Sequence, residues 1–304
     1  MRSKLSIKSP VIAVLGSLLC VTLWGTAFPL IKLGYSQFAL EQGDLGAKLL
    51  FAGLRFTLAG ALVFLFGLLK TKKPAIPERR DLPSVLLLGT VMTALQYLLA
   101  YVGVGYTTAS NTSILTGSAS IISVAAAAVF FKNDKLTPQK ALGCVVGLAG
   151  ITVVNLGDVS LDAVNFLGDL LVLMSAVSSA AGNIITKKIS KNRDPVTITA
   201  WQLLFGGLIL TAAGLLWGGR LDLGNAGGVC ILLWLAVVSA VSFLLWTALL
   251  RVHPVSKITV FTMLVPVFGT LWSWLLLGES VFSAANIISL LLIAAGILLV
   301  NIRQ

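Results

Sequence analysis

The chain has 304 residues, of which 57% are hydrophobic and only 11% are charged, and its mean hydropathy is +0.98. Soluble domains carry roughly 25% charged residues, so this composition excludes an ordinary soluble protein and indicates one that is embedded in lipid. The formal net charge of +11 does not indicate a nucleic-acid partner, because the basic residues form short clusters between apolar runs and no stripe with interleaved aromatic side chains.

The first apolar run follows Arg2, Lys4 and Lys8, as the apolar region of a signal peptide would. This run continues from Val11 to about Ile31, which is too long for a signal peptide, and no small-x-small cleavage motif closes it. We therefore predict that it is the first membrane helix.

Apolar segments of membrane-spanning length follow one another along the whole chain. A bilayer core of roughly 30 Å requires about 20 apolar residues in a helix. Segments of this kind lie near residues 11–32, 48–69, 84–104, 108–131, 137–156, 166–188, 196–218, 227–249, 256–277 and 283–302. We therefore predict an all-α integral membrane protein with ten transmembrane helices.

Lysine and arginine gather in alternate connections between these segments. Eighteen of the 22 basic residues then fall on one side of the membrane: Arg2, Lys4, Lys8, Lys70, Lys72, Lys73, Arg79, Arg80, Lys132, Lys135, Lys140, Lys187, Lys188, Lys191, Arg193, Arg251, Lys257 and Arg303. The opposite side receives Lys32, Lys48, Arg220 and most of the acidic residues. Because loops rich in lysine and arginine face the cytoplasm, we predict that both termini are cytoplasmic and that the protein spans the cell inner (plasma) membrane.

The two halves of the sequence echo each other. Residues 149–155, AGITVVN, close the fifth segment, and residues 295–301, AGILLVN, close the tenth. Each half has five helices, an odd number, so the second half enters the membrane from the opposite face. We predict two inverted five-helix repeats, residues 1–156 and 157–304, around a central cavity that opens by alternating access. The alternative is a chance likeness between apolar helices.

Five segments carry a resemblance to a known family. They are LWGTAF at residues 23–28, LRF at 54–56, YTTASNTSIL at 106–115, LAGI at 148–151 and LGE at 277–279. In this order and spacing they resemble the EamA branch of the drug/metabolite transporter superfamily, over nearly the whole chain and once in each half. The sequence departs from the family at residues 132–134, KND, where the family shows Leu-Gly-Glu. The resemblance implies ten helices around a central cavity and the movement of metabolites, often the export of amino acids or related compounds.

Arg55 is the most informative single residue within the membrane segments. An ionisable residue at this depth costs about 2.5–3.5 kcal/mol and usually faces a cavity or a partner. Its planar guanidinium could bind a substrate carboxylate or phosphate; alternatively, it extends to the membrane surface or neutralises the carbonyls at its helix end. We take Gln202 as the equivalent position in the second half, which would make a charge-based site asymmetric.

The third segment carries Gln96, Tyr97 and Tyr101, and its two tyrosines lie one turn apart on one face. They could line a cavity for an amphipathic solute or form a packing stripe between helices; we favour the cavity. Close helix packing explains the small residues that recur in the fourth and sixth segments. Asn111 and Asn183 exceed what packing requires, so we assign them to the cavity.

Two prolines and two tryptophans complete the candidate set. Pro29 and Pro266 each remove a backbone hydrogen bond, which lipid tolerates only where protein or water satisfies the freed carbonyl. We predict that they are hinges or helix breaks at the cavity edge. Trp24 and Trp246 lie inside membrane segments and could contact substrate, although tryptophan near a helix end more often anchors the protein at the interface.

Few residues could couple transport to a proton gradient. Proton relays require carboxylates or histidine within the membrane, but the acids of this chain lie near helix ends. Glu279 is the best proton candidate, with a structural role at its helix end as the alternative. This shortage favours facilitated transport or exchange.

These observations define an expected function. We predict a transporter of small metabolites, an exporter of amino acids or related polar or amphipathic solutes, and not an enzyme. We expect a small-molecule substrate and the lipid bilayer as partners, no nucleic acid, either a monomer or a homodimer, and no cofactor, metal or catalytic residue. The alternatives are an intramembrane enzyme, which would need converging acid, base or metal ligands, and a membrane scaffold without transport.

Overall fold

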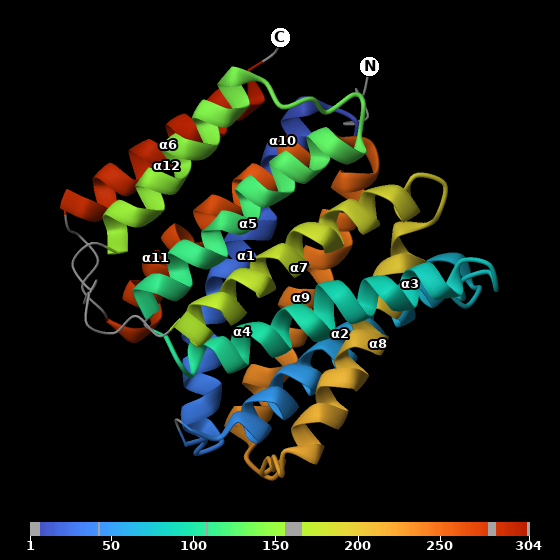
Figure 1. The fold of residues 1–304 in the computed structure, drawn as a ribbon. Helices are drawn as coiled ribbons and strands as arrows, with labels where there is room; N and C mark the ends of the chain where they lie inside the picture. The colour runs from blue at the N-terminus through green and yellow to red at the C-terminus, as the bar shows by residue number, and fades with distance from the viewer. Residues whose placement is uncertain (1–6, 42, 108, 156–165, 279–283, 303–304) are drawn as a thin grey trace, which may run out of the picture.

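The computed structural model describes residues 7–41, 43–107, 109–155, 166–278 and 284–302, and all regular secondary structure among them is helical (Figure 1). The helices in chain order are α1 (Pro10–Gln37), α2 (Leu45–Thr71), α3 (Leu82–Leu88), η1 (Gly89–Leu95), α4 (Gln96–Val104), α5 (Ala109–Phe130), α6 (Pro138–Asn155), α7 (Phe166–Ser190), α8 (Pro195–Leu216), α9 (Ala226–Val252), α10 (Val255–Thr259), η4 (Val260–Leu264), α11 (Val265–Leu277) and α12 (Ala284–Asn301). The predicted all-α class is confirmed, and the helix bounds agree with the predicted segments to within five residues.

Nine helical segments among the described residues are long and apolar enough to cross a membrane. Two of them are composite, because Leu82–Val104 combines α3, η1 and α4, and Val255–Leu277 combines α10, η4 and α11. In α6, the shorter apolar helix Pro138–Val153 falls below that length. The chain is therefore a multi-pass membrane protein, while the count of ten spans and the cytoplasmic placement of the termini remain predictions.

Several of these helices begin at a polar N-cap residue or end at a residue with a left-handed backbone conformation. At the start of α2, α8 and α9, the N-cap side chains of Asp44, Asp194 and Asn225 accept hydrogen bonds of 2.8, 3.1 and 3.0 Å from the backbone N–H three residues later. Lys72 ends α2 with a φ of 55° and Gly278 ends α11 with a φ of 70°. These caps satisfy backbone groups that a helix end would otherwise leave unpaired.

The two composite spans contain turns that are not α-helical. η1 is a π-helix that precedes Gln96 directly, and η4 is a 3₁₀-helix that precedes α11, with Pro266 in the first turn of α11. A 3₁₀-helix therefore lies next to Pro266, whose role as a hinge or helix break stays a prediction. Pro29, in contrast, lies inside α1, which continues through it from Pro10 to Gln37, so the chain does not break there.

The backbones of α2 and α8 approach each other at glycines. A Cβ on Gly53 would lie 2.3 Å from the backbone N of Thr211, and a Cβ on Gly207 would lie 2.4 Å from the backbone N of Thr57. In both contacts a glycine of one helix meets a threonine of the other. Contacts further along α2 fall further back along α8, so the two helices are antiparallel.

The pair α6 and α12 shows the same relation, and the two helices run side by side in Figure 1. A Cβ on Gly143 would lie 2.6 Å from the carbonyl O of Gly296, and a Cβ on Gly150 would lie 2.9 Å from the carbonyl O of Ser289. Contacts further along α6 fall further back along α12, so these two helices are also antiparallel.

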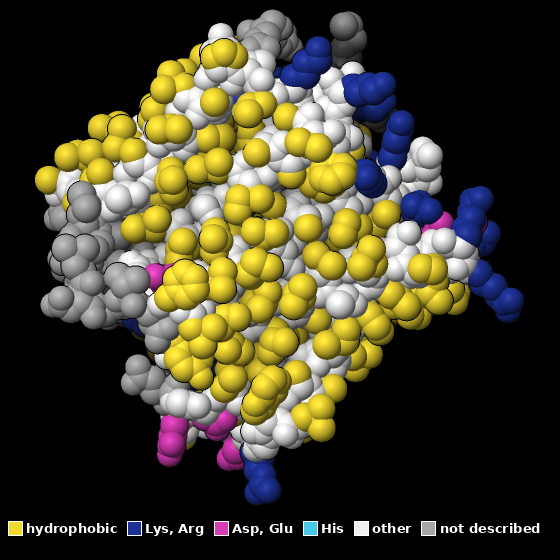
Figure 2. All heavy atoms as spheres, in the orientation of Figure 1, with side chains coloured by type: hydrophobic (Ala, Val, Ile, Leu, Met, Phe, Trp, Pro, Cys, Tyr) yellow, Lys and Arg dark blue, Asp and Glu magenta, His cyan; other side chains and the backbone are white. Residues whose placement is uncertain are grey.

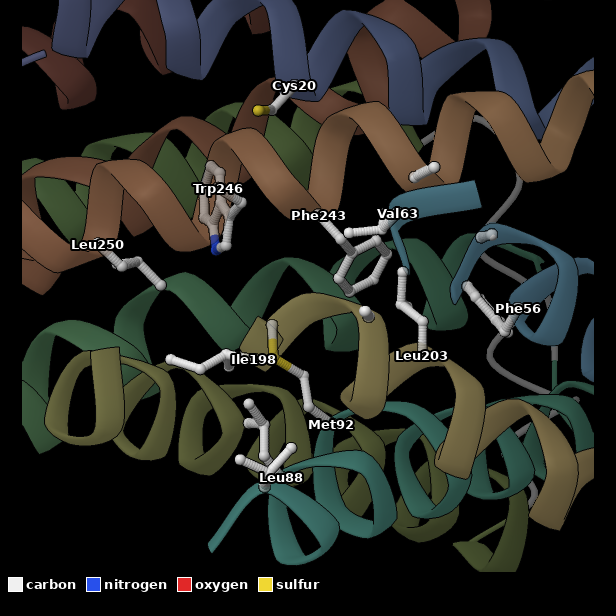
Figure 3. Packing of buried hydrophobic residues seen from close by; sticks show 14 of the residues in the cluster. Cys20, Phe56, Val63, Leu88, Met92, Ile198, Leu203, Phe243, Trp246 and Leu250 are labelled. Carbon is white, nitrogen blue, oxygen red and sulfur yellow. The ribbon is translucent and has the colours of Figure 1, made fainter. Parts of the chain in front are cut away.

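A buried core cluster lies where α1, α2, η1, α7, α8 and α9 meet. Its larger side chains include Phe56, Met92, Leu203, Phe243 and Trp246, as Figure 3 shows. Outside this core, exposed apolar side chains cover the visible face of the molecule, and most of the visible Lys and Arg side chains gather along its upper right edge (Figure 2). Such a surface suits an apolar band in lipid with a basic rim at one membrane face.

Candidate substrate site

Arg55 lies on the face of α2 that meets α9. Its side chain is 3% exposed, and its Nε donates a hydrogen bond of 2.8 Å to the Ser239 hydroxyl. That hydroxyl in turn donates to the carbonyl O of Leu235 at 2.9 Å, so its oxygen is free to accept from the guanidinium. Arg55 therefore turns inward to α9 and does not extend to the membrane surface.

The charge of Arg55 has no anionic partner in the described part of the chain. No Asp or Glu oxygen there lies within 4.0 Å of its guanidinium. The guanidinium also lies over the ring of Phe56, whose centroid is 5.0 Å from the guanidinium carbon. A buried charge without a counter-ion is costly, so this environment suits an anionic ligand whose charge would compensate it.

An aromatic row continues from this guanidinium across the core. Its members are Phe56, Tyr97, Phe243, Trp24 and Trp246. The ring centroids are 4.5 Å apart for Phe56 and Tyr97, 6.1 Å for Phe56 and Phe243, 5.6 Å for Phe243 and Trp24, and 4.9 Å for Trp24 and Trp246. Figure 3 shows Phe243 and Trp246 projecting from α9 into the same interior. The row offers an apolar surface next to a cation.

Polar groups occur at the far end of the aromatic row. The indole N–H of Trp246 donates to Oδ1 of Asn183 at 3.0 Å, and the amide of Asn183 donates to the Ser123 hydroxyl at 3.3 Å. These bonds join α9, α7 and α5. The indole N–H of Trp24 is buried and has no acceptor among the described residues. It is a donor that a bound solute could satisfy.

The structure thus brings together five of the predicted site residues: Trp24, Arg55, Tyr97, Asn183 and Trp246. Tyr101 packs against the same core cluster, and Gln96 is half-buried at the start of α4. Phe56, Phe243 and Ser239 belong to this site but are not among the predicted site residues. A signal was present, because Ser239, Phe243 and Trp246 follow the spacing of one helix face.

Gln202 lies on a different side of α8 from the pair of glycines that face α2. It is fully buried where α8 packs on η1, and neither of its amide atoms has a hydrogen-bond partner among the described residues. Its equivalence with Arg55 in the second half stays a prediction, because antiparallel contacts between α2 and α8 do not fix which residues of the two helices correspond.

Asn111 belongs to a contact between helix ends. Its amide nitrogen lies 3.3 Å from each carboxylate oxygen of Asp169 in the first turn of α7, and the hydroxyl of Thr107 donates to the same carboxylate. This arrangement ties the start of α5 to α7, so the structure does not bring Asn111 to the aromatic row. Glu279, the proton candidate, lies outside the described residues.

Two hollows in the described part of the chain lie elsewhere. One, of about 330 Å³, is apolar and lies between α2 and α9, where Leu54, Thr57 and Leu232 are among its lining residues. The other, of about 430 Å³, lies at the basic end of the molecule and is lined by lysines. Neither is lined by the aromatic row, so the predicted central cavity remains a prediction.

Comparisons with known proteins point to one family. The sequence model of the EamA-like transporter family matches residues 11–156 and again residues 166–302. The chain is 26% identical to "Uncharacterized transporter YoaV" of Bacillus subtilis, over 93% of this chain and 94% of that protein. It is 25% identical to a "Probable amino-acid metabolite efflux pump" of Salmonella typhimurium, over 92% of each. A crystal structure that shares 18% identity superimposes with a TM-score of 0.80 over 96% of this chain and 98% of the other, which shows a common fold.

Proposed function

The chain belongs to the EamA-like transporter family and is a membrane transporter, and on this basis we propose that it exports amino acids or related carboxylates by alternating access. The proposed route crosses the cell inner membrane, with both termini in the cytoplasm. The name of the Salmonella typhimurium relative, which speaks of amino-acid metabolites and of efflux, supports both the solute class and the direction.

Two observations support a mechanism in which two inverted units move against each other. The family model matches the chain once in each half, which agrees with units at residues 1–156 and 157–304. In addition, α2 packs on α8 and α6 packs on α12 in antiparallel orientation, with glycines at both contacts. A pseudo-twofold axis in the membrane plane would produce such contacts, and inverted repeats of this kind underlie alternating access.

The solute class follows from the environment of Arg55, which is the observation that carries the proposal. A guanidinium can hold a carboxylate with two parallel hydrogen bonds, and here it is buried and without an acid among the described residues. The adjoining aromatic row would cover the apolar part of an amphipathic solute. The indole N–H of Trp24, which has no acceptor among the residues that the structure describes, supplies one further donor.

Flux measurements in liposomes that contain the purified protein test this proposal. We expect saturable uptake of labelled amino acids, and we expect Arg55→Gln to lower it by about tenfold to a hundredfold, since hydrogen bonds to charged groups contribute about 1.5–3 kcal/mol. Uptake of the corresponding amino-acid amides, which lack the carboxylate charge, should change much less in the same variant. An enzyme or a scaffold would show no saturable flux at all.

Arg251→Gln provides the matched control, because Arg251 is an exposed arginine in the last turn of α9. We expect this variant to transport like the unaltered protein. If Arg55→Gln takes up carboxylates as fast as the unaltered protein does, or loses carboxylate and amide uptake to the same extent, Arg55 is not the carboxylate anchor and the proposed solute class is wrong.

A further inference from the structure

A basic hollow lies at the end of the molecule where lysines and arginines gather. Its volume is about 430 Å³, and it lies between the α5–α6 connection, α10 and the end of α12. Lys132, Lys135, Lys140 and Lys257 line it, together with apolar residues of the α12 end such as Ile302. Figure 1 shows the α5–α6 connection at the same end of the molecule as the C-terminus.

A buried carboxylate organises the inner side of this basic hollow. Asp134 is 3% exposed and accepts a hydrogen bond of 2.9 Å from the backbone N of Ser256 at the start of α10, and a second from the Ser256 hydroxyl. It also accepts from the Nζ of Lys140 at 2.6 Å. Lys140 donates further to the carbonyl O of Lys135 at 2.9 Å. Asp134 thus fixes the relative positions of the lining elements and neutralises one of the four lysines.

The remaining three lysines leave the basic hollow positively charged. Lys132 and Lys135 are exposed and Lys257 is half-buried, and no carboxylate in the described part of the chain lies within 4.0 Å of any of them. Three ammonium groups around one hollow repel each other, and a bound anion would remove that repulsion. Phosphate groups are ligands that lysine binds well as a point charge.

The apolar rim of the basic hollow is formed by the end of α12, where Leu299, Val300 and Ile302 line it and Ile302 is 56% exposed. The residues next to the lining in sequence are also exposed and apolar, since Leu298 is 67% exposed and Leu136 is 50% exposed. In a multi-pass membrane protein, such residues beside a basic end meet the lipid just below its headgroups. A small phosphorylated metabolite would gain nothing from this rim, whereas a lipid would place its phosphate among the lysines and its acyl chains along α12.

We propose that the basic hollow binds the headgroup phosphate of an anionic phospholipid from the adjacent leaflet. Basic pockets between membrane helices are suited to this role. The site is separate from the proposed transport site and does not depend on it. The α5–α6 connection and α10 belong to different halves of the chain, so a bound headgroup would join the two halves at this membrane face.

Lipid titration of the purified protein in a neutral detergent tests this inference. The probe is dioctanoyl phosphatidylglycerol, with dioctanoyl phosphatidylcholine and inorganic phosphate as separate arms, and the readouts are bound lipid by native mass measurement and the thermal unfolding midpoint. We expect phosphatidylglycerol alone to bind and to raise the midpoint. Lys132→Gln combined with Lys257→Gln should weaken its binding at least tenfold, since each lysine near an anionic headgroup contributes measurably.

Lys72→Gln combined with Lys73→Gln is the matched control, because these two exposed lysines at the end of α2 lie outside the basic hollow. Equal weakening in both double variants would overturn the proposal in favour of a general charge effect. An equal midpoint shift with inorganic phosphate would overturn it in favour of a free-anion site.

Two further variants guard against a loss of folding. Lys132→Arg combined with Lys257→Arg keeps both charges and should retain phosphatidylglycerol binding within about threefold, since an arginine and a lysine attract a headgroup with the same unit charge. Ile302→Gln removes part of the apolar rim and should weaken phosphatidylglycerol binding while leaving the unfolding midpoint of the lipid-free protein unaltered. An unchanged affinity in Ile302→Gln would count against a lipid occupant.

Discussion

The two faces of α2 differ in almost every physical respect. Towards α8, the helix presents Gly46, Gly53 and Gly60, each of which would place a Cβ within 2.6 Å of the backbone of the facing segment. Towards α9, it presents the buried cation of Arg55, held by Ser239 and flanked by an aromatic ring. On the first face, backbone packs directly on backbone and leaves no space for a side chain. On the second face, a buried charge has no acid among the described residues to compensate it.

This difference explains how a membrane helix can carry an uncompensated charge. Close backbone packing supplies the favourable van der Waals contacts that hold membrane helices together. The glycine face therefore fixes the position of α2, and the opposite face can present an energetically costly residue to a solute without loss of the fold. We expect changes to the glycine face to act on stability and changes to the Arg55 face to act on transport.

The largest expected effect comes from Gly53→Val. The backbone N of Thr211 cannot move away as a flexible side chain could, so the added Cβ must separate α2 from α8, at a cost of at least about 3 kcal/mol, the upper range for overpacking. Size-exclusion profiles and thermal unfolding in detergent would measure the loss. Gly43→Ala is the control, since nothing lies within 4 Å of a Cβ there. A stable, monodisperse Gly53→Val protein would refute the rigid role of this face.

Ser239→Ala changes the face of α2 that carries Arg55, and we expect it to have a smaller effect than Gly53→Val. It removes the acceptor for the Nε of Arg55, and we expect the KM for carboxylate solutes to rise about tenfold, as for the loss of a charged hydrogen bond, while the maximal rate is retained. Ser242→Ala is the control, because Ser242 is also buried and donates to the backbone of α9 but has no bond to Arg55. Equal KM values in the two variants would exclude a positioning role for Ser239.

Gln202→Leu tests whether the buried amide on α8 belongs to the substrate site around Arg55. The amide of Gln202 is buried without a partner among the described residues, so its replacement by an apolar side chain should leave stability unchanged or raise it by about 1 kcal/mol. Transport should be unaffected. A loss of transport with unaltered thermal stability would return Gln202 to the substrate site and contradict the separation of the two faces.

The smallest effect is expected at the helix ends, where Asp81 pairs with Arg193. The hydrogen bond from Arg193 holds the pKa of the Asp81 carboxyl below its ordinary value of 3.8. The pair therefore stabilises the folded state above that value, and the contribution disappears as the pH falls through the lower folded-state pKa. The unfolding midpoint of Asp81→Asn should lie slightly below that of the unaltered protein at pH 7, and the difference should vanish in acid. A constant difference across this range would disprove the linkage.

Sequence patterns predicted the fold well because lipid imposes simple rules on length and polarity. The segment expected at residues 48–69 is α2, Leu45–Thr71, whose start is fixed by the side chain of Asp44. Arg55 was identifiable because a charge inside an apolar run stands out. η1 was not predicted, since a π-helix depends on how Gly89 packs against α8 and has no compositional signature.

The hydrogen-bond partners of polar side chains were harder to predict than the depth of those side chains in the membrane. Asn111 and Asn183 are both amides within apolar helices, yet one pairs with Asp169 at a helix end and the other lies beside Trp246 in the core. These partners lie 58 and 63 residues away in the sequence. Only the crossing of helices decides which amide meets which partner, and periodicity within one helix contains no information about it.

The crossed contacts of α2 with α8 have a consequence for how such a chain could arise. Each half of the chain contributes one glycine-rich helix to this antiparallel pair, so two copies of an ancestral half inserted in opposite orientations could meet through the same surface. That arrangement would be an isologous interface of the kind found in homodimers. Joining the copies in one polypeptide fixes their ratio at one to one, and it frees a single copy to acquire a buried cation such as Arg55.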